Sequence, residues 1–281
     1  MITNRRSAAL IAALALSSTL LSGCFYGSPR ATVPASMTSA VPAATTVGID
    51  VSTNNGKVVI SQDASAGGAT VSAEAKLVSE DRAQRFTINA TLTDDGVLVV
   101  RPVWPDGERH NNEKCSFEIT APGLSTVTAR TSNGSVRLAG GEGKAYVQTS
   151  NGSITITQRE GDTVARTSNG SIKVTDSAGT LDLASSNGAI TIRGTSPGTA
   201  GAPYHWRAST SNGSIQLDLT EPVTCRIRAS TSNGKATVSQ RSASGESRRL
   251  VSATSVDHDL GDGEGEIVLS TSNGSIVVVT P

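Results

Sequence analysis

The triplet Ser-Asn-Gly occurs seven times in this chain, and its spacing constrains the fold more than any other feature. The first four asparagines of the triplet, Asn133, Asn151, Asn169 and Asn187, are each 18 residues apart. Spacing of this regularity is typical of a repeated structural unit that stacks on its neighbours. The later intervals are 25, 21 and 40 residues, which indicates insertions, and we place loops at 194–203 and 241–249.

The residues on both sides of each triplet alternate in character. With the asparagine as position zero, positions +3 and +5 are apolar, as in Ile154 and Ile156, and positions −6 and −4 alternate with polar residues in the same way. Position −2 is Thr in every copy except Ser185. Alternation with a period of two indicates half-buried strands. Each unit is therefore expected to be a strand, an Asn-Gly corner and a second strand.

Two architectures contain such units. Asn-Gly between alternating strands is a strong hairpin signal, which would give an antiparallel meander. Alternatively, each unit is one coil of a parallel β-solenoid. The parity of the side chains favours the solenoid, because an inward Thr at −2 would place the asparagine on the inner side of the corner as well. Stacked about 4.8 Å apart, such asparagines can form an amide ladder, and the following glycine would supply a positive φ.

The sequence thus predicts an all-β fold, a parallel β-helix with coils of about 18 residues. Its structural ladder is expected to consist of the asparagines and the glycines that follow them: Asn133, Asn151, Asn169, Asn187, Asn212, Asn233, Asn273, Gly134, Gly152, Gly170, Gly188, Gly213, Gly234 and Gly274.

The first 23 residues have the organisation of an export signal. Arg5 and Arg6 precede an apolar run that is too short to span a bilayer well and ends in small residues. Leu21-Ser22-Gly23-Cys24 resembles the lipobox of bacterial lipoproteins. That resemblance implies that Cys24 becomes the mature N-terminus and carries acyl chains such as palmitate, which would anchor the protein to the cell membrane or the outer membrane. The alternative is an ordinary cleaved signal followed by a chance cysteine.

The remaining chain divides by composition. Residues 24–46 are rich in Pro, Ala, Ser and Thr and are expected to be a flexible tether. We assign residues 47–122 to an N-terminal β part of the solenoid and 123–281 to the regular repeats. Removal of residues 1–23 leaves 22 basic and 24 acidic side chains, so no nucleic-acid partner is indicated.

Cys115 and Cys225 raise the question of a disulfide in an exported protein. Both lie at positions of inward parity. We expect them to be five coils apart, about 24 Å at ~4.8 Å per strand, whereas a disulfide needs α-carbons within about 7 Å. The sequence therefore predicts two buried free thiols.

Candidate catalytic, metal and cofactor residues are lacking in the sequence pattern. His110, His205 and His258 are far apart and have no metal-ligand spacing. The acidic segment Asp257 to Glu266 does not match a calcium loop, and we interpret it as a solvated loop, with weak cation binding as the alternative. The apolar segment Ile276 to Val279 would be a sticky edge if it formed the last strand, and we expect the N-terminal strands or a second molecule to cover it.

The repeat resembles the bacterial putative-adhesin family of β-strand-repeat domains of unknown function. The resemblance covers residues 47–281 and is carried by segments such as Asn151-Gly152-Ser153-Ile154-Thr155-Ile156, with an early copy at Asn55-Gly56-Lys57-Val58-Val59-Ile60. It extends to Asp95–Val100 and Phe117–Pro122. It implies that the fold is a right-handed parallel β-helix.

Three functional hypotheses remain open. The first is a lipid-anchored envelope protein that presents a β-helix for binding or adhesion to a glycan, a cell-wall polymer or a protein. The second is a non-catalytic component of envelope-stress signalling or envelope assembly. The third, a polysaccharide-acting enzyme, is disfavoured because the outer positions lack paired carboxylates.

Overall fold

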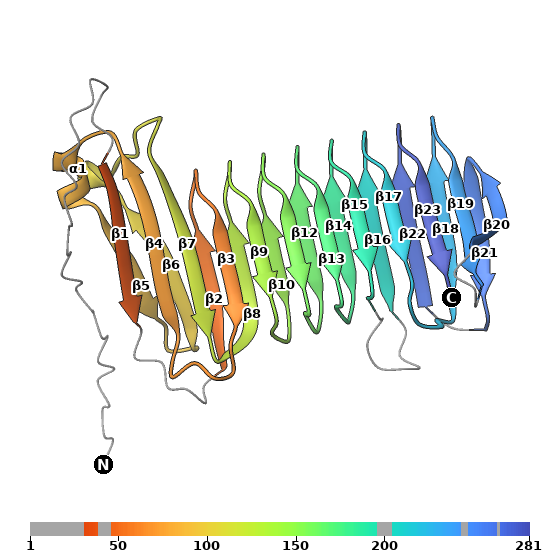
Figure 1. Cartoon of the computed structure of the whole chain (residues 1–281), viewed down its shortest axis with the longest axis horizontal. Helices are drawn as coiled ribbons and strands as arrows, with labels where there is room; N and C mark the ends of the chain where they lie inside the picture. Colours follow the sequence, from red (N-terminus) through yellow and green to blue (C-terminus); the bar gives the residue numbers. More distant parts are fainter. Residues whose placement is uncertain (1–30, 39–45, 196–203, 243–246, 263–264) are drawn as a thin grey trace, which may run out of the picture.

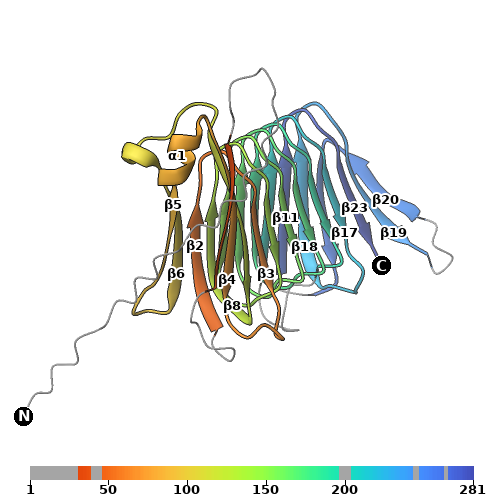
Figure 2. The same cartoon turned by 60° about the vertical axis from the view of Figure 1, so that its left-hand side comes forward.

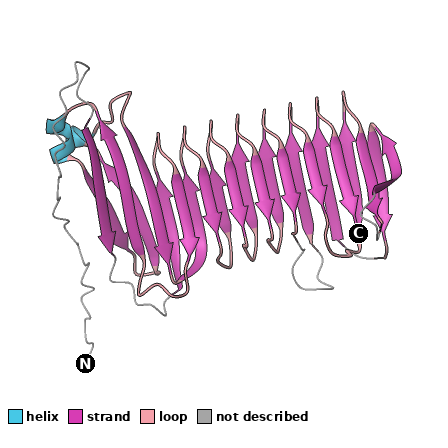
Figure 3. Ribbon diagram, in the orientation of Figure 1, coloured by secondary structure: helices cyan, strands magenta, loops and turns pink. Residues whose placement is uncertain are grey.

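The computed structural model describes residues 31–38, 46–195, 204–242, 247–262 and 265–281, with side chains for all of these except 31–38. The described chain is almost entirely β-structure, arranged as two long sheets that face each other along a rod (Figure 1, Figure 3). One sheet has 12 strands and the other has 11. We call them sheet A and sheet B. The predicted all-β class is confirmed.

Sheet A contains, in spatial order, β1 (Ala31–Thr38), β4 (Thr70–Leu77), β7 (Lys114–Ala121), β3 (Val58–Gln62), β9 (Val136–Ala139), β11 (Ile154–Thr157), β13 (Ile172–Thr175), β15 (Ile190–Arg193), β17 (Ile215–Asp218), β23 (Ile276–Thr280), β19 (Ala236–Arg241) and β20 (Ser247–Ala253).

Sheet B contains, from the opposite end of the rod, β21 (Ser255–Leu260), β18 (Cys225–Thr231), β22 (Gly265–Thr271), β16 (His205–Thr210), β14 (Leu181–Ser185), β12 (Thr163–Thr167), β10 (Ala145–Gln148), β8 (Gly123–Arg130), β2 (Thr46–Ser52), β6 (Val97–Val103) and β5 (Thr87–Leu92). The described helices are α1 (Glu80–Arg85) and a 3₁₀ turn at Pro105–Gly107.

The strands that flank the Ser-Asn-Gly corners pair in parallel, so the solenoid hypothesis describes this region and the meander hypothesis was wrong. Strand β10 lies between β8 and β12, with Ala145 opposite Val127 on one side and Thr163 on the other. Strand β11 pairs with β9 and β13 in the same way. Each offset is 18 residues, so the strands of successive coils stack along the rod (Figure 2) and equivalent residues lie in register.

The core consists of the inward positions of these columns. Ile154, Ile172 and Ile190 lie in register in sheet A and are at most 1% exposed. Val147 and Ala165 face them from sheet B and are fully buried. Full burial of an aliphatic side chain contributes roughly 1.5–3 kcal/mol. A core of this kind needs few aromatic residues, which agrees with the 3% aromatic content.

The chain order is exchanged near both ends of the rod. Strands β18 and β19 follow β16 and β17 in the chain but are not their neighbours in the sheets. Strand β22 lies between β16 and β18, and β23 lies between β17 and β19 (Figure 1). The segment between β19 and β22 forms β20 and β21, which pair antiparallel with β19 and β18. At the other end, β4 and β5 pair antiparallel with β7 and β6.

Several expectations about the C-terminal region were therefore wrong. The segment Ile276 to Val279 is in β23, an interior strand between β17 and β19, so neither the N-terminal strands nor a second molecule needs to cover it. Most of the expected solvated loop Asp257 to Glu266 is strand, in β21 and β22. The expected loop at 241–249 includes the start of β20. The expected loop at 194–203 lies mostly outside the described residues.

Part of the predicted tether at 24–46 is also strand. Strand β1 pairs antiparallel with β4, with Ala31 opposite Leu77 and Thr38 opposite Thr70. Its sequence, Ala-Thr-Val-Pro-Ala-Ser-Met-Thr, alternates apolar and polar residues except at the proline, which is typical of a strand. The prediction of a tether used the composition of the segment and did not consider this alternation. The physical reason for the strand is the free edge of β4, which would otherwise expose unpaired main-chain groups. A proline is tolerated there because β1 is itself an edge strand.

The glycines of the corners are required by close approach and not by a positive φ. The corner glycines are absent from the positive-φ residues of the described chain. A β-carbon on Gly170 would lie 1.8 Å from the carbonyl oxygen of Gly152, and one on Gly188 would lie 1.7 Å from that of Gly170. The expected left-handed conformation was therefore wrong. The residue must be glycine because the next coil passes directly against it.

We predict that Gly170→Ala is strongly destabilising, by about 3 kcal/mol or more, because neither main chain can move aside within the stack. Urea unfolding followed by circular dichroism measures the change in midpoint. Gly67→Ala is the matched control, since a β-carbon there meets no atom within 4 Å. A Gly170→Ala variant as stable as Gly67→Ala would contradict the close-approach explanation.

Candidate functional site

The threonines at position −2 form a buried column of hydroxyl groups beside the corner. Thr167 Oγ1 donates to the carbonyl oxygen of Gly152 (3.0 Å), and Ser185 Oγ donates to that of Gly170 (2.9 Å). The hydroxyl oxygen also accepts a hydrogen bond from a backbone amide of its own corner, as Gly170 N donates to Thr167 Oγ1 (3.2 Å). This explains why position −2 is Thr or Ser: the position needs a short hydroxyl that satisfies the carbonyl of the adjacent coil. The inward orientation of these residues was predicted, but their partner was not.

The asparagines form a continuous ladder of side-chain amides. In the centre, Asn151 Nδ2 donates to Asn133 Oδ1 (2.6 Å), and Asn169 Nδ2 donates to Asn151 Oδ1 (2.6 Å). The column continues through Asn187, Asn212, Asn273 and Asn233, in that spatial order. At the other end, the amide of Asn133 contacts the amide of Asn55 of the early copy at 2.5 Å.

The ladder lies on the outside of the corner, so the predicted inward orientation of the asparagines was wrong. The seven asparagines of the triplets are exposed, as are the serines before them. The parity argument failed because it carried the alternation of a strand through the corner. The chain bends there, and two consecutive residues, Ser and Asn, both face solvent before the chain turns inward at the glycine.

The hydrogen bonds between the triplet asparagines all point in the same direction along the rod, since each Nδ2 donates toward the same end. Hydrogen bonds arranged head to tail polarise one another. One N–H of each interior amide remains directed away from the ladder bond, since the amide nitrogen has two donors. The corner therefore presents a regular row of polar groups to solvent.

At the turns on the other side of the coil from the Asn-Gly corners, a buried arginine donates to main-chain carbonyls, as the threonine hydroxyls do at the corners. Arg159 is fully buried, donating from Nη2 to the carbonyl oxygens of Glu142 and Ser125 (both 2.5 Å) and from Nη1 to that of Gly140 (3.2 Å). Burial lowers the pKa of its guanidinium to about 10. The sequence pattern does not indicate this residue, because it occurs in one repeat only.

An open pocket of about 310 Å³ lies beside these turns, lined by Gln158, Glu160, Asp176, Ser177, Ala178 and Gly194. Gln158 and Asp176 adopt φ values of 51° and 50° there. Ser177 Oγ donates to the carbonyl oxygen of Thr175 (2.9 Å) and accepts from Arg159 N (3.2 Å). The Ser177 hydroxyl is therefore used to stabilise the turn. Because this hydroxyl already has two partners in the turns, the pocket is a weaker candidate for a binding site than the two broad outer faces.

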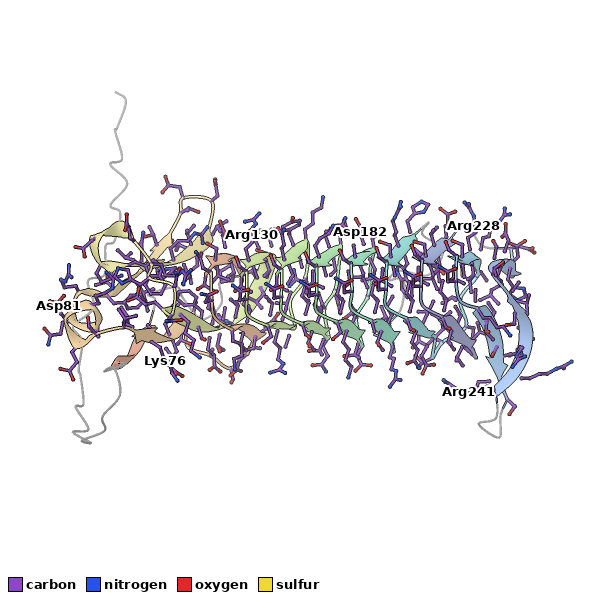
Figure 4. All side chains as sticks on the ribbon, turned by 90° about the horizontal axis from the view of Figure 1, so that it is seen from above. Lys76, Asp81, Arg130, Asp182, Arg228 and Arg241 are labelled. Atoms are coloured by element: carbon purple, nitrogen blue, oxygen red, sulfur yellow. The ribbon has the colours of Figure 1, made fainter. Side chains whose placement is uncertain are left out.

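Several arginines on the outer face of sheet B are paired with carboxylates of the same face, where Figure 4 labels Arg130, Asp182 and Arg228. Arg166 Nη1 donates to Asp182 Oδ1 (3.1 Å), and Arg101 Nη2 donates to Asp50 Oδ2 (2.8 Å). Arg226 Nε donates to Asp257 Oδ1 (2.7 Å), which lowers the pKa of that carboxyl group.

The same pairing explains the acidic segment Asp257 to Glu266. Its Glu266 pairs with Arg228 and lies 3.4 Å from His205 Nδ1. In the described part of the chain, no group of three or more His, Cys, Asp or Glu side chains is placed to hold a metal ion.

The outer face of sheet A has a different character. From β3 to β15, its outward positions are mainly Ser and Thr with four exposed cations, Lys57, Arg137, Lys173 and Arg193. No ion pair with these four cations is found among the described residues. Ser153 Oγ and Ser171 Oγ lie 3.2 Å apart on this face. The face is flat and polar, and its positive charge is not neutralised by the chain itself.

Cys115 and Cys225 are free and buried, as predicted. They lie in β7 of sheet A and β18 of sheet B. Strand β7 is eight positions from β19, the coil partner of β18, or about 38 Å at ~4.8 Å per strand. The separation exceeds the expected five coils because β7 lies outside β3 and the last coils exchange places. Burial raises the pKa of the Cys115 thiol to about 12, so it is protonated at neutral pH.

Cys24 and the predicted signal segment lie outside the described residues. None of the helices in the described ranges has the length and apolar character required to cross a bilayer.

Comparison with known proteins identifies a family and several structural neighbours. The model of the Toastrack DUF4097 family matches residues 22–248. A putative adhesin from Bacteroides fragilis NCTC 9343 is 13% identical, with 89% of this chain and 98% of that chain covered and a TM-score of 0.45. A putative adhesin from Parabacteroides merdae ATCC 43184 is 12% identical over 89% and 96% of the two chains, with a TM-score of 0.45.

A putative cell adhesion protein from Clostridium sporogenes ATCC 15579 is 12% identical over 89% and 100% of the two chains, with a TM-score of 0.38. No match was found among curated proteins. At these identities and TM-scores, the neighbours carry no argument about a ligand.

We predict that the ladder stabilises interior coils more than the terminal coil. Asn169 makes two ladder hydrogen bonds, one to Asn151 and one from Asn187, whereas Asn233 makes one, to Asn273. At about 0.5–1.5 kcal/mol per hydrogen bond, Asn169→Ala should cost roughly twice as much as Asn233→Ala. Urea unfolding of both variants, with Ser168→Ala as the control on the same corner, measures the difference. Equal costs for Asn169→Ala and Ser168→Ala would show that the ladder contributes nothing.

Proposed function

Since the chain belongs to the Toastrack DUF4097 family, we propose that it is an exported lipoprotein that displays a right-handed β-solenoid at the cell envelope and binds an envelope ligand without catalysing a reaction. The ligand would be a glycan, a cell-wall polymer or a protein. The observation that carries this proposal is the outer face of sheet A, a flat surface of hydroxyl groups and unneutralised cations that extends over successive strands.

A flat and rigid face suits binding better than it suits catalysis. Catalytic sites commonly hold pairs of titratable groups in a recess that excludes water, whereas the outward positions of β9, β11 and β13 are mainly Ser, Thr and single cations. Parallel strands also fix the main chain beneath these side chains at regular intervals, so no backbone ordering is needed when a ligand binds along them.

The anchor belongs to the same proposal. Cys24 follows an apolar run and a Leu-Ser-Gly sequence, and residues 25–30 lead to β1 at one end of the rod. Attachment of two or three acyl chains at Cys24 would hold the protein stably at a bilayer, because each buried methylene contributes about 0.8 kcal/mol. The rod would then be tethered by the end that carries β1, β4 and α1.

We predict that Cys24→Ser releases the protein from the membrane fraction. In cells that express the unchanged chain, the protein should sediment with membranes, and mass spectrometry should find a lipid-modified peptide that begins at Cys24. Cys225→Ser serves as the control, because that thiol is buried in the fold and has no part in anchoring. Membrane sedimentation that is the same for Cys24→Ser and the unchanged chain would refute the lipid anchor.

We also predict that the full chain, recovered from native membranes in mild detergent, retains an envelope polymer or a discrete protein partner. Composition analysis of the retained material distinguishes the two, since a glycan or cell-wall polymer supports adhesion and a single membrane protein supports a signalling or assembly role. Measured turnover of a polysaccharide that is lost when one outer-face carboxylate is replaced would overturn the non-catalytic proposal.

A further inference from the structure

We infer that the outer face of sheet A is a docking surface for a linear anionic polysaccharide that lies along the rod, across strands β3 to β15. This inference rests on the proposed function and specifies its ligand class. It starts from four exposed cations. Arg137 in β9 and Lys173 in β13 occupy the same column, separated by Thr155 of β11. Lys57 precedes β3, the neighbour of β9, and Arg193 ends β15, the neighbour of β13.

These cations form a line and not a broad patch. Four strand intervals separate β3 from β15, which gives a length of about 19 Å at ~4.8 Å per strand. Lys57 and Arg193 are displaced in opposite directions along their strands, so the line crosses the strands obliquely. A flexible linear polymer can follow such a line and place one charged group at each cation.

No carboxylate of this face competes with a ligand over those strands. The outward positions of β3, β9, β11, β13 and β15 contain Ser, Thr, Ala, Val, Arg137, Lys173 and Arg193, but no Asp or Glu. The nearest carboxylates flank the line. Glu118 in β7 lies next to Val59 of β3, Asp176 follows β13 at the turn beside Gly194, and Asp218 in β17 is in register with Arg193 but paired with Arg241. On sheet B, by contrast, several arginines have a carboxylate partner on the same face, as Arg166 has in Asp182.

The surface between the cations matches a sugar polymer in chemistry. Ser153 and Ser171 are exposed, Thr155 and Thr191 are half-buried, and all four are neutral hydroxyl groups that donate and accept. Aromatic side chains, on which nucleic-acid bases would stack, are absent from the outward positions of these strands. Exposed apolar side chains that would insert into a bilayer are likewise absent from β9, β11 and β13.

The test measures binding of the full chain in detergent to immobilised polygalacturonate, a linear polymer of carboxylated sugars, at two ionic strengths. We expect saturable binding that weakens as salt rises, because the cations are exposed and screening acts on them fully. The double variant Arg137→Gln, Lys173→Gln should bind about tenfold more weakly, since it loses two charge contacts. Both side chains are exposed, so the variant should unfold at the same urea concentration as the unchanged chain.

The matched control carries the same change in net charge on the other face. Arg130→Gln, Arg207→Gln removes two exposed arginines of sheet B and should bind as the unchanged chain does. Equal loss in both double variants would show that net charge alone drives binding, which overturns the assignment to sheet A. Binding to vesicles that contain phosphatidylglycerol but not to polygalacturonate would identify a lipid surface as the occupant and would also overturn the inference.

The outcome can be separated from that of the proposed function. If material from native membranes is retained equally by the unchanged chain and by Arg137→Gln, Lys173→Gln, the protein binds an envelope ligand elsewhere, and only this inference fails. If neither retains any envelope material, the proposed function fails together with it.

Discussion

The spacing of parallel strands, about 4.8 Å, is the constraint on which the rest of this structure depends. At the corner, this spacing brings the carbonyl of one glycine so close to the next coil that no β-carbon fits between them. It also allows a Thr hydroxyl to reach the carbonyl of the adjacent coil, as Thr149 Oγ1 does with Gly134 (2.9 Å), and an Asn amide to reach the next amide. Thr, Asn and Gly therefore recur together because the same strand spacing requires each of them at its position in the corner.

The sequence was sufficient to predict what depends on the repeat itself. Alternation at positions such as Ile154 and Ile156 indicated the strands, and the constant interval indicated parallel stacking with an amide ladder. It was insufficient at the corner, because alternation says nothing about a bend. The same triplet is compatible with an asparagine inside or outside and with a glycine of either sign of φ. The packing of Gly170 against Gly152 decides between these, and that packing is a tertiary contact.

The ends of the rod could not be predicted for a different reason. An antiparallel strand that caps a sheet has the same alternation as a strand that continues it, as the pairing of Val256 in β21 with Ala229 in β18 illustrates. The exchange of β22 and β23 with β18 and β19 leaves the repeat of each corner unchanged, so no local signal records it. As a result of this exchange, sheet A ends in the antiparallel strand β20 and sheet B ends in the antiparallel strand β21. These carry exposed charges such as Arg248 and Asp257, which discourage edge-to-edge pairing with other chains.

Parallel stacking in register also creates a problem of charge, and the two outer faces solve it differently. A charged residue that repeats in every coil would lie about 4.8 Å from its own copies and repel them. Sheet A places Thr155 between Arg137 and Lys173, and it offsets Lys57 and Arg193 by two residues along the strand from the cation of the neighbouring rung. Sheet B places carboxylates such as Asp182 beside its arginines. Both arrangements reduce the repulsion between adjacent rungs, but only the second offsets most of the positive charge. Stability of the stack therefore does not require the uncompensated positive line on sheet A, and its presence is better explained by an anionic partner outside the chain.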